Sequence, residues 1–443
     1  MTVPVRICVV GGGSYHWGPV LLQDLAATQG LAGTIVLHDL DPGAAEDMRR
    51  LGERLLAAAG SGLRVETNPD PREALRDADF VVVTITTGGL AAMRHDLEIP
   101  LRHGIVQTVG DTVGPGGLSR ALRNVPVMAA LARTMTEVCP DAWLINLSNP
   151  MAAMTRAVTK TSAIKTVGLC HELFGIRRVF CQLFAATPDE VGLEVAGTNH
   201  LTWLLAASVR GQDGMDLLRQ HLAGGGAIPV RSPAEAHLAP FVDHWRVKLA
   251  LLDRYGYLPA AGDRHVAEFF PFFLQSDKEG TAGPWVLPTH VAHRQQMAEA
   301  ARAKVRAWLD RSAPLPTGRS DEEVADVIVA LATGRPHTIV ANLPNRGQID
   351  NLPRGAVVET RAVVMAGGIQ PLTAGALPPG LLATVQNHVA NQELIVEAAL
   401  GGDRALSIQA FLGDPLTGGA RSVPGLVDKL IAANRAVLPR FPA

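Results

Sequence analysis

The chain contains 443 residues, of which 47% are hydrophobic and 19% are charged, and its formal net charge at pH 7 is −2. This length can bury a large core, in two or three domains or in one large α/β unit, and the small net charge argues against nucleic acid or a membrane surface as the main partner. The four cysteines, Cys8, Cys139, Cys170 and Cys181, are too few and too scattered for a disulfide framework, which favours a reducing cytoplasm.

The first 150 residues alternate between short apolar runs and amphipathic stretches. The N-terminal run, 5–10, lacks the features of a signal peptide, and no window along the chain reaches about eighteen apolar residues. We therefore expect a cytoplasmic protein without a membrane span. This alternation is typical of an α/β fold, in which a Rossmann-like, doubly wound parallel sheet carries helices on both faces. The pattern predicts strands at 5–10, 34–38, 79–84 and 142–146, and helices at 20–27, 44–59 and 118–131.

A glycine turn, 11–13, joins the first predicted strand to the first predicted helix. Such a turn lets backbone N–H groups approach a pyrophosphate at the helix N-terminus, although His16 stands where the usual fingerprint has a third glycine. Asp39 ends the second strand, where a carboxylate can accept from a ribose hydroxyl and would repel the 2′-phosphate of NADP. Thr86 follows the third strand and either lies near the nicotinamide or belongs to an ordinary polar loop. The sequence therefore predicts an NAD site.

Two later loops carry further polar candidates. Asp111 lies in the glycine-rich stretch 110–117, where it faces a ligand or belongs to a structural turn. Asn149 follows the strand at 142–146, and Pro150 can open the next helix. Asn149 then lies at the carboxyl end of the sheet, where α/β proteins bind ligands, or caps the helix, or does both. The predicted NAD-binding residues are Gly11, Gly12, Gly13, Ser14, Asp39, Thr86 and Asn149.

A cysteine and a histidine follow two other apolar runs. Cys170 is followed by His171 and Glu172, and His200 ends the predicted strand 193–200. A thiolate and an imidazole at the ends of two strands can hold a soft-to-borderline divalent ion. Their spacing matches no known metal motif, so a buried cysteine and a hydrogen-bonded histidine remain the alternative interpretation.

The second half of the chain is less regular, and we expect it to form an α+β domain. We divide the chain into an NAD-binding domain, 1–195, and a catalytic and oligomerisation domain, 196–443, with the site at their interface. The glycine-rich stretch 211–227 predicts a mobile insertion or lid. Asp263, Arg264, His265 and Glu268 stand close together behind a Gly/Pro turn, which favours an active-site wall over a core. Further strands are predicted at 201–209, 339–345 and 356–364, and further helices at 241–255, 296–309, 321–331 and 379–400.

The chain resembles glycoside hydrolase family 4, the NAD- and metal-dependent glycosidases, essentially from end to end. The stretches 110–117, 170–172 and 260–265 look most like the α-galacturonidase branch, and less like the branches that act on 6-phosphoglycosides. The resemblance implies a lactate/malate dehydrogenase-like fold and a small-molecule sugar substrate, here an acidic one. The motifs that carry it are Gly11-Gly12-Gly13-Ser14, Asn149-Pro150, Cys170-His171, Asn199-His200, the stretch 345–353 with Glu359, and Asp414-Pro415-Leu416.

The resemblance also implies a mechanism that differs from two-carboxylate glycosidases. NAD⁺ would remove hydride from C3 of the sugar, which acidifies the proton at C2. A divalent ion, usually Mn²⁺, would bridge the C2 and C3 oxygens and stabilise the resulting enediolate. A base would then remove the C2 proton, the C1–O bond would break by elimination, water would add at C1, and NADH would return the hydride. NAD and Mn²⁺ are thus the implied cofactors.

The resemblance assigns Cys170 and His200 as metal ligands and Asn149 as a residue that holds sugar hydroxyls. His171 would orient a hydroxyl or ligate the metal. Glu172 is our candidate for the acid that protonates the leaving oxygen, with a carboxylate at a helix N-terminus as the alternative.

The base is less clear, because the tyrosine that several family members use is absent from 262–268. Asp263 or His265 would have to serve, with a slight preference for Asp263. Arg264, or else Arg294, would pair with a substrate carboxylate, unless either forms a surface salt bridge. Asp111 is a further candidate for substrate binding.

Three functions stay open at this point. The first is an α-galacturonidase or a related α-uronidase. The second is another family 4 glycosidase, which acts on an α-glucuronide, an α-galactoside or another acidic sugar. The third is a plain NAD-dependent dehydrogenase of the lactate/malate type, which would not need Cys170 and His200 as a metal pair. Family resemblance also leads us to expect a homodimer or homotetramer.

Overall fold

The computed structural model describes residues 2–230, 236–274, 285–286, 288–418, 423–438 and 440–441. Its strands are β1 (Val3–Val10), β2 (Leu31–His38), β3 (Gly62–Thr67), β4 (Phe80–Val83), β5 (Trp143–Asn146), β6 (Lys165–Gly168), β7 (Val191–Thr198), β8 (Leu201–Val209), β9 (Gln212–Asp213), β10 (Leu258–Pro259), β11 (His337–Pro344), β12 (Val357–Met365) and β13 (Gly368–Pro371).

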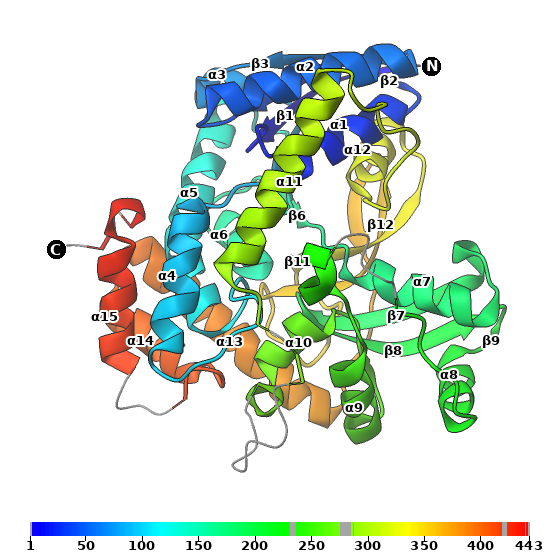
Figure 1. Ribbon diagram of the computed structural model, residues 1–443, viewed down its shortest axis with the longest axis vertical. Helices are drawn as coiled ribbons and strands as arrows, with labels where there is room; N and C mark the ends of the chain where they lie inside the picture. The colour runs from blue at the N-terminus through cyan, green and yellow to red at the C-terminus, as the bar shows by residue number, and fades with distance from the viewer. Residues whose placement is uncertain are drawn as a thin grey trace.

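The helices follow the same chain order (Figure 1). They are α1 (Trp17–Ala27), α2 (Pro42–Ala59), α3 (Pro71–Leu75), α4 (Gly89–Leu101), α5 (Gly114–Val138), α6 (Met151–Thr161), α7 (Glu172–Phe184), α8 (Gly214–Ala223), α9 (Arg246–Tyr255), α10 (Asp263–Phe269), α11 (Val291–Leu309), α12 (Val324–Thr333), α13 (Pro379–Gly401), α14 (Arg404–Gly413) and α15 (Val423–Ala433).

One sheet runs through both halves of the chain, in the order β10-β8-β7-β12-β11-β6-β5-β4-β1-β2-β3. The strands from β3 to β6 are parallel, and β11, β12, β7 and β8 continue the sheet in antiparallel pairs. The predicted parallel sheet with an α+β second part is therefore confirmed. The division that we predicted at residue 195 falls within β7.

Helices cover both faces of the parallel strands, because successive side chains enter two different cores. Val81 and Val83 pack into the core that contains α5, whereas Phe80 and Val82 pack into the core that contains α1, α2 and α12. Burial on both faces explains why these strands read as continuous apolar runs. In Figure 1, α4, α5, α14 and α15 lie on one side of the molecule, and α7, α8 and α9 extend from the other.

The stretch 211–227 differs from our prediction of a mobile insertion or lid, which is wrong for most of its length. β9 pairs with β8, and α8 follows at once. The Asp213 carboxylate caps α8 by accepting from the N–H groups of Met215 and Asp216. Met215 and Leu218, three residues apart, share one helix face and are buried in the core beneath β7 and β8. The apolar pair thus fixes a segment whose glycines alone suggested mobility.

The loops at the carboxyl ends of β1, β4, β5 and β6 meet the turn between β7 and β8, and these segments line one cleft. A cis peptide joins Asn149 to Pro150 in the loop after β5. α11 crosses the front of the molecule and packs beside α2 and α4 (Figure 1). Within the described ranges, no helix combines the length and the apolar character that a membrane crossing needs.

Candidate active site

A cavity of about 660 Å³ opens at the carboxyl ends of the parallel strands. It is lined by the glycine turn after β1, the loops after β4 and β5, the segment after β6, the β7–β8 turn, α10 and α11. This is the end of an open α/β sheet at which ligands bind. Nearly all of the predicted site residues lie on its wall or directly behind it.

The predicted NAD-binding turn is held close to the neighbouring strands. Gly11 has a φ of +88°, and a Cβ there would lie 2.7 Å from Thr84 Oγ1, so only glycine fits. The Asp39 carboxylate accepts from the N–H of Gly13 at 2.9 Å and from that of Asp41 at 2.9 Å. Ser14 Oγ accepts from the N–H of Trp17 at the start of α1. Asp39 therefore braces the glycine turn, and its contact with a ribose stays a prediction.

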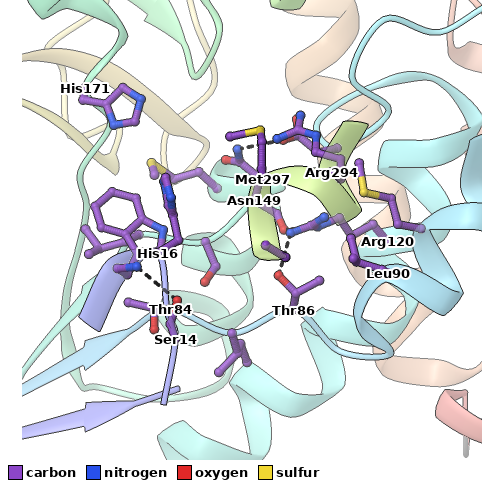
Figure 2. Close-up of a pocket in the computed structure, with 18 of the residues that line it drawn as sticks. Ser14, His16, Thr84, Thr86, Leu90, Arg120, Asn149, His171, Arg294 and Met297 are labelled. Atoms are coloured by element: carbon purple, nitrogen blue, oxygen red, sulfur yellow. Dashed lines mark hydrogen bonds between the residues drawn. The ribbon is translucent and has the colours of Figure 1, made fainter. Parts of the chain in front are cut away.

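Arg120 links the predicted nicotinamide loop to the Asn149 loop. Its Nε donates to the Asn149 carbonyl at 2.8 Å, and its guanidinium also donates to Thr86 Oγ1 at 3.0 Å. Asn149 Nδ2 in turn donates to Asp111 Oδ2 at 3.3 Å. Figure 2 shows Thr86, Arg120 and Asn149 side by side, with Ser14 and His16 further toward the glycine turn. The predicted residues Thr86, Asn149 and Asp111 thus belong to one hydrogen-bond network. Arg120, which the sequence pattern did not indicate, joins Thr86 to Asn149 in this network.

Cys170 and His200, which lie thirty residues apart in sequence, are brought together as predicted. Cys170 Sγ lies 3.5 Å from His200 Nε2. The Thr112 hydroxyl donates to Asp111 Oδ1 at 2.8 Å, so its own oxygen accepts from His200 Nδ1, also at 2.8 Å. This arrangement places the proton of His200 on Nδ1 and leaves the lone pair of Nε2 directed toward Cys170, as a metal ligand requires.

Two further candidate ligands, Asp111 and His265, lie beside His200. Asp111, His200 and His265 offer ligand atoms within 4.8 Å of one another. Burial, followed by the effect of His265, lowers the pKa of His200 to about 4, so this imidazole is neutral at pH 7. Burial raises the pKa of Asp111, but His265, His200 and Arg120 outweigh it and hold that pKa below its ordinary value. A thiol, neutral imidazoles and an ionised carboxylate form a donor set that fits a soft-to-borderline divalent ion.

His265 and Asp263, the two alternative bases, point in different directions. His265 lies against His200, with ring centroids 3.8 Å apart. Its Nδ1 is 3.7 Å from Asp111 Oδ1, and its Nε2 is 3.8 Å from Glu172 Oε1. Asp263 is 4% exposed and accepts from the N–H of Lys248 at 3.0 Å, with Lys248 Nζ 3.9 Å away. Only His265 reaches the cluster of metal-ligand candidates.

Glu172 and His171 line the same cavity from the segment after β6. Glu172 Oε2 accepts from the N–H of Gly262 at 2.6 Å, and its Oε1 lies 3.8 Å from His171 Nε2. Burial raises the pKa of Glu172, but His265, His171 and His200 outweigh it and lower the pKa to about 2. His171 is half-exposed, and its Nδ1 lies 3.0 Å from Glu322 Oε1. The hydrogen bond with Glu322 raises the pKa of His171 to about 9, despite burial. His171 thus lies apart from Cys170 and His200.

Arg264 and Arg294 share one aromatic ring at the far end of the cavity. Their guanidinium carbons lie 4.7 Å and 5.1 Å from the ring centre of Phe241. Burial and the charge of Arg294 lower the pKa of Arg264 to about 10. Both Nε atoms are buried without a hydrogen-bond partner, and neither arginine forms an ion pair within the described residues. Arg264 also donates to the Thr108 carbonyl and to the Thr289 hydroxyl. Two part-buried cations side by side favour an anion between them.

Several residues of this site gave no recognisable signal in the sequence. Arg120 is one of three arginines in α5, with no local pattern that distinguishes it from Arg123 or Arg133, and Glu322 precedes a helix by two residues. Phe241 is an isolated aromatic residue. Their roles depend on which segments lie side by side, and one sequence does not reveal that.

Two family models match the chain. "Family 4 glycosyl hydrolase" matches residues 6–185, and "Family 4 glycosyl hydrolase C-terminal domain" matches residues 195–417. The α-galacturonidase of Bacillus subtilis is 36% identical over 423 residues, which cover 93% of this chain and 93% of that protein. The chain is therefore similar to a characterised glycosidase over nearly its whole length.

Solved structures give the same result for the fold. A Bacillus subtilis protein described as a putative glucosidase superposes with a TM-score of 0.89 at 34% identity, and covers 96% of this chain and 99% of its own. A 6-phospho-beta glucosidase from Thermotoga maritima, solved with manganese, NAD⁺ and glucose-6-phosphate, superposes with a TM-score of 0.80 at 23% identity over 98% and 99% of the two chains. The lactate dehydrogenase of Cryptosporidium parvum reaches 0.53 at 14% identity, over 90% and 99%. The predicted similarity to dehydrogenase folds is confirmed.

Proposed function

Because the chain belongs to family 4 of the glycosyl hydrolases, we propose that it hydrolyses α-galacturonides, with NAD and a divalent ion such as Mn²⁺ as cofactors. The sequence similarity to an α-galacturonidase supports the substrate class. The T. maritima relative, solved with manganese and NAD⁺, supports the cofactors.

The observation that carries the substrate assignment is the pair of Arg264 and Arg294 on Phe241. The two guanidinium groups are part-buried side by side, and each has a buried Nε without a partner. A galacturonide ring brings a carboxylate on C6, which can accept from both guanidiniums. A neutral galactoside would bring no such anionic partner, so the same pair selects against it.

The sugar ring would then lie between this arginine pair and the cluster of Cys170, His200 and Asp111. Cys170 and His200 would hold the divalent ion, with Asp111 and the Asn149 amide beside it. When bound, NAD and the ion supply hydride exchange at C3 and polarisation of the adjacent oxygens. The NAD would follow the glycine turn of residues 11–14 toward Thr86. The cavity of about 660 Å³ has the size expected for ligands of this kind.

We assign removal of the C2 proton to His265 rather than to Asp263. The His265 ring is tilted against that of His200, with the ring centroids 3.8 Å apart, and would therefore lie close to a sugar ring held at the proposed metal site. Asp263 hydrogen-bonds to the backbone of α9 and lies near Lys248 Nζ. Glu172 lies between His265 and His171, 3.8 Å from each Nε2. Because its pKa of about 2 leaves it ionised at pH 7, Glu172 would act as the predicted acid only after it takes a proton from one of these two imidazoles.

The test uses p-nitrophenyl α-galacturonide with NAD⁺ and Mn²⁺, with and without a chelator. We expect nitrophenol release that requires both cofactors, while NADH does not accumulate, because each turnover restores NAD⁺. Stoichiometric NADH would instead identify a dehydrogenase. Equal rates on the α-galacturonide and the α-galactoside would refute the role of the arginine pair in substrate choice.

A further inference from the structure

The two proposed metal ligands come from strands that are not neighbours. Cys170 follows β6 and His200 follows β7, and the sheet places β11 and β12 between them. Glu359 in β12 pairs with Gly197 of β7 and with Asn342 of β11, and Asn342 pairs with Gly168 of β6. The floor beneath the ligand pair is therefore built by the two intervening strands.

Glu359 faces the same small void as Cys170 and His200. This void, of about 10 Å³, is lined by all three residues and by Thr202. It has room for about one water molecule. The Glu359 carboxylate thus lies directly behind the ligand pair, on the side away from the open cavity.

The carboxylate of Glu359 is buried and accepts hydrogen bonds from neutral groups, and the same void is lined by a second carboxylate, that of Glu172. Glu359 is 7% exposed. Its Oε1 accepts from Asn342 Nδ2 at 2.6 Å and from Asn199 Nδ2 at 3.3 Å, and its Oε2 accepts from the Thr202 hydroxyl. No lysine, arginine or histidine in the described part of the chain pairs with it, whereas the buried Asp96 has Arg123 as its partner.

A buried carboxylate is costly unless a positive charge compensates it. Three hydrogen-bond donors fix the orientation of the carboxylate, but they add no charge. Cys170 as a thiolate would add a second negative charge at the same place. The missing positive charge is therefore located where the ligand pair would hold a divalent ion.

We propose that Glu359 is the buried counter-charge of this ion, a positioning residue that raises the affinity of Cys170 and His200 for Mn²⁺ without coordinating it. This inference rests on the metal site of the proposed function. Outer groups of this kind typically change metal affinity by roughly 10- to 100-fold.

The experiment measures Mn²⁺ binding to the full chain with NAD⁺ and without sugar, from the electron paramagnetic resonance signal of free Mn²⁺. Glu359→Gln keeps the shape and removes the charge, and we expect its Kd to rise at least about tenfold. Glu359→Asp keeps the charge and loses hydrogen-bond geometry, and we expect its Kd to stay within about threefold of the original chain. Glu393→Gln removes a carboxylate of α13 that pairs with Arg156 and Lys160 of α6, and its Kd should not change.

A second measurement separates charge from architecture. In excess chelator, Glu359→Gln should unfold at the same temperature as the original chain or above it, because it removes an uncompensated charge. Addition of Mn²⁺ should raise the unfolding temperature of Glu359→Gln by less than it raises that of the original chain. A lower unfolding temperature in chelator with an unchanged Kd would show a merely structural role and overturn the inference.

Cys170→Ser distinguishes this inference from the function on which it rests. If Cys170→Ser loses Mn²⁺ binding while Glu359→Gln keeps it, only the role of Glu359 fails. If Cys170→Ser binds Mn²⁺ as tightly as the original chain, the proposed metal site fails, and the inference fails with it. Normal Mn²⁺ binding without galacturonide turnover would refute the proposed substrate and leave the role of Glu359 intact.

Discussion

Replacing Arg294 by methionine should weaken the selectivity of the arginine pair for a uronate, because Arg264 remains as the only cation of the pair. The methionine keeps an unbranched apolar stem against Phe241 and removes one guanidinium. If the pair binds the C6 carboxylate, the variant loses a charged hydrogen bond in a desolvated place, which contributes about 3 kcal/mol. At about 1.4 kcal/mol per tenfold change, kcat/KM for the galacturonide should fall by roughly 150-fold.

The same change should leave the fold as stable as before or more so. Burial and Arg294 together lower the pKa of Arg264 from its ordinary value of 12.5 to about 10, which corresponds to roughly 3 kcal/mol against the charged form. Burial is the larger part of this cost, and the smaller part disappears with Arg294. We therefore expect an unfolding temperature that is equal to that of the original chain or slightly higher.

The assay compares kcat/KM for p-nitrophenyl α-galacturonide and α-galactoside, both with NAD⁺ and Mn²⁺. The loss should be confined to the galacturonide, and the galactoside value should change by less than about threefold. Arg306→Met is the matched control, since Arg306 lies on the same helix and is exposed. An equal loss on both substrates would mean that Arg294 supports the cavity wall rather than the carboxylate, and the reasoning would be refuted.

Three further changes follow from single observations. Cys170→Ser should abolish metal-dependent turnover and leave NAD binding, measured by tryptophan fluorescence, largely intact; an unchanged rate would contradict the ligand assignment. Gly11→Ala should weaken NAD binding and lower the unfolding temperature, because a Cβ would lie 2.7 Å from Thr84 Oγ1 at a φ of +88°; unaltered binding would show that the turn does not approach the cofactor. Burial lowers the pKa of His388 from 6.5 to about 4, so its folded form is neutral, and its contribution to stability is present above pH 6.5 and lost as the pH falls toward 4, by up to about 3 kcal/mol. His388→Leu should flatten this part of the stability profile in urea unfolding at pH 7 and pH 4.5, and equal slopes would disprove the assignment.

The parallel half of the fold could be predicted because its signals are local. β1, β2, β4 and β5 lie in short apolar runs, and the glycine turn lies directly between β1 and α1. The strand β3 and the helices α3 and α4 were not anticipated. β3 alternates between buried and exposed residues and contains Arg64 and Glu66, so it does not read as a buried run.

The choice between Asp263 and His265 shows where local reasoning ends. Both residues lie in the first turn of α10, two positions apart, so their side chains point about 200° apart around the helix. One must face away from the cavity if the other faces it. The sequence identified the turn, but only the packing of α10 against α9 shows that Asp263 is the residue that faces Lys248.

The same argument applies to the pairing of Cys170 with His200. Each residue ends a strand, which a sequence pattern can indicate, but the distance between them depends on the order β6-β11-β12-β7. β11 and β12 arrive more than 130 residues later in the chain, from 337–344 and 357–365. The Cys170–His200 pair therefore forms only when the C-terminal half has inserted two strands between its ligands. Metal binding should accordingly require that β11 and β12 have joined the sheet. Glu359 lies in β12 and pairs with β11 and β7, so it belongs both to the inserted strands and to the surroundings of the metal ligands.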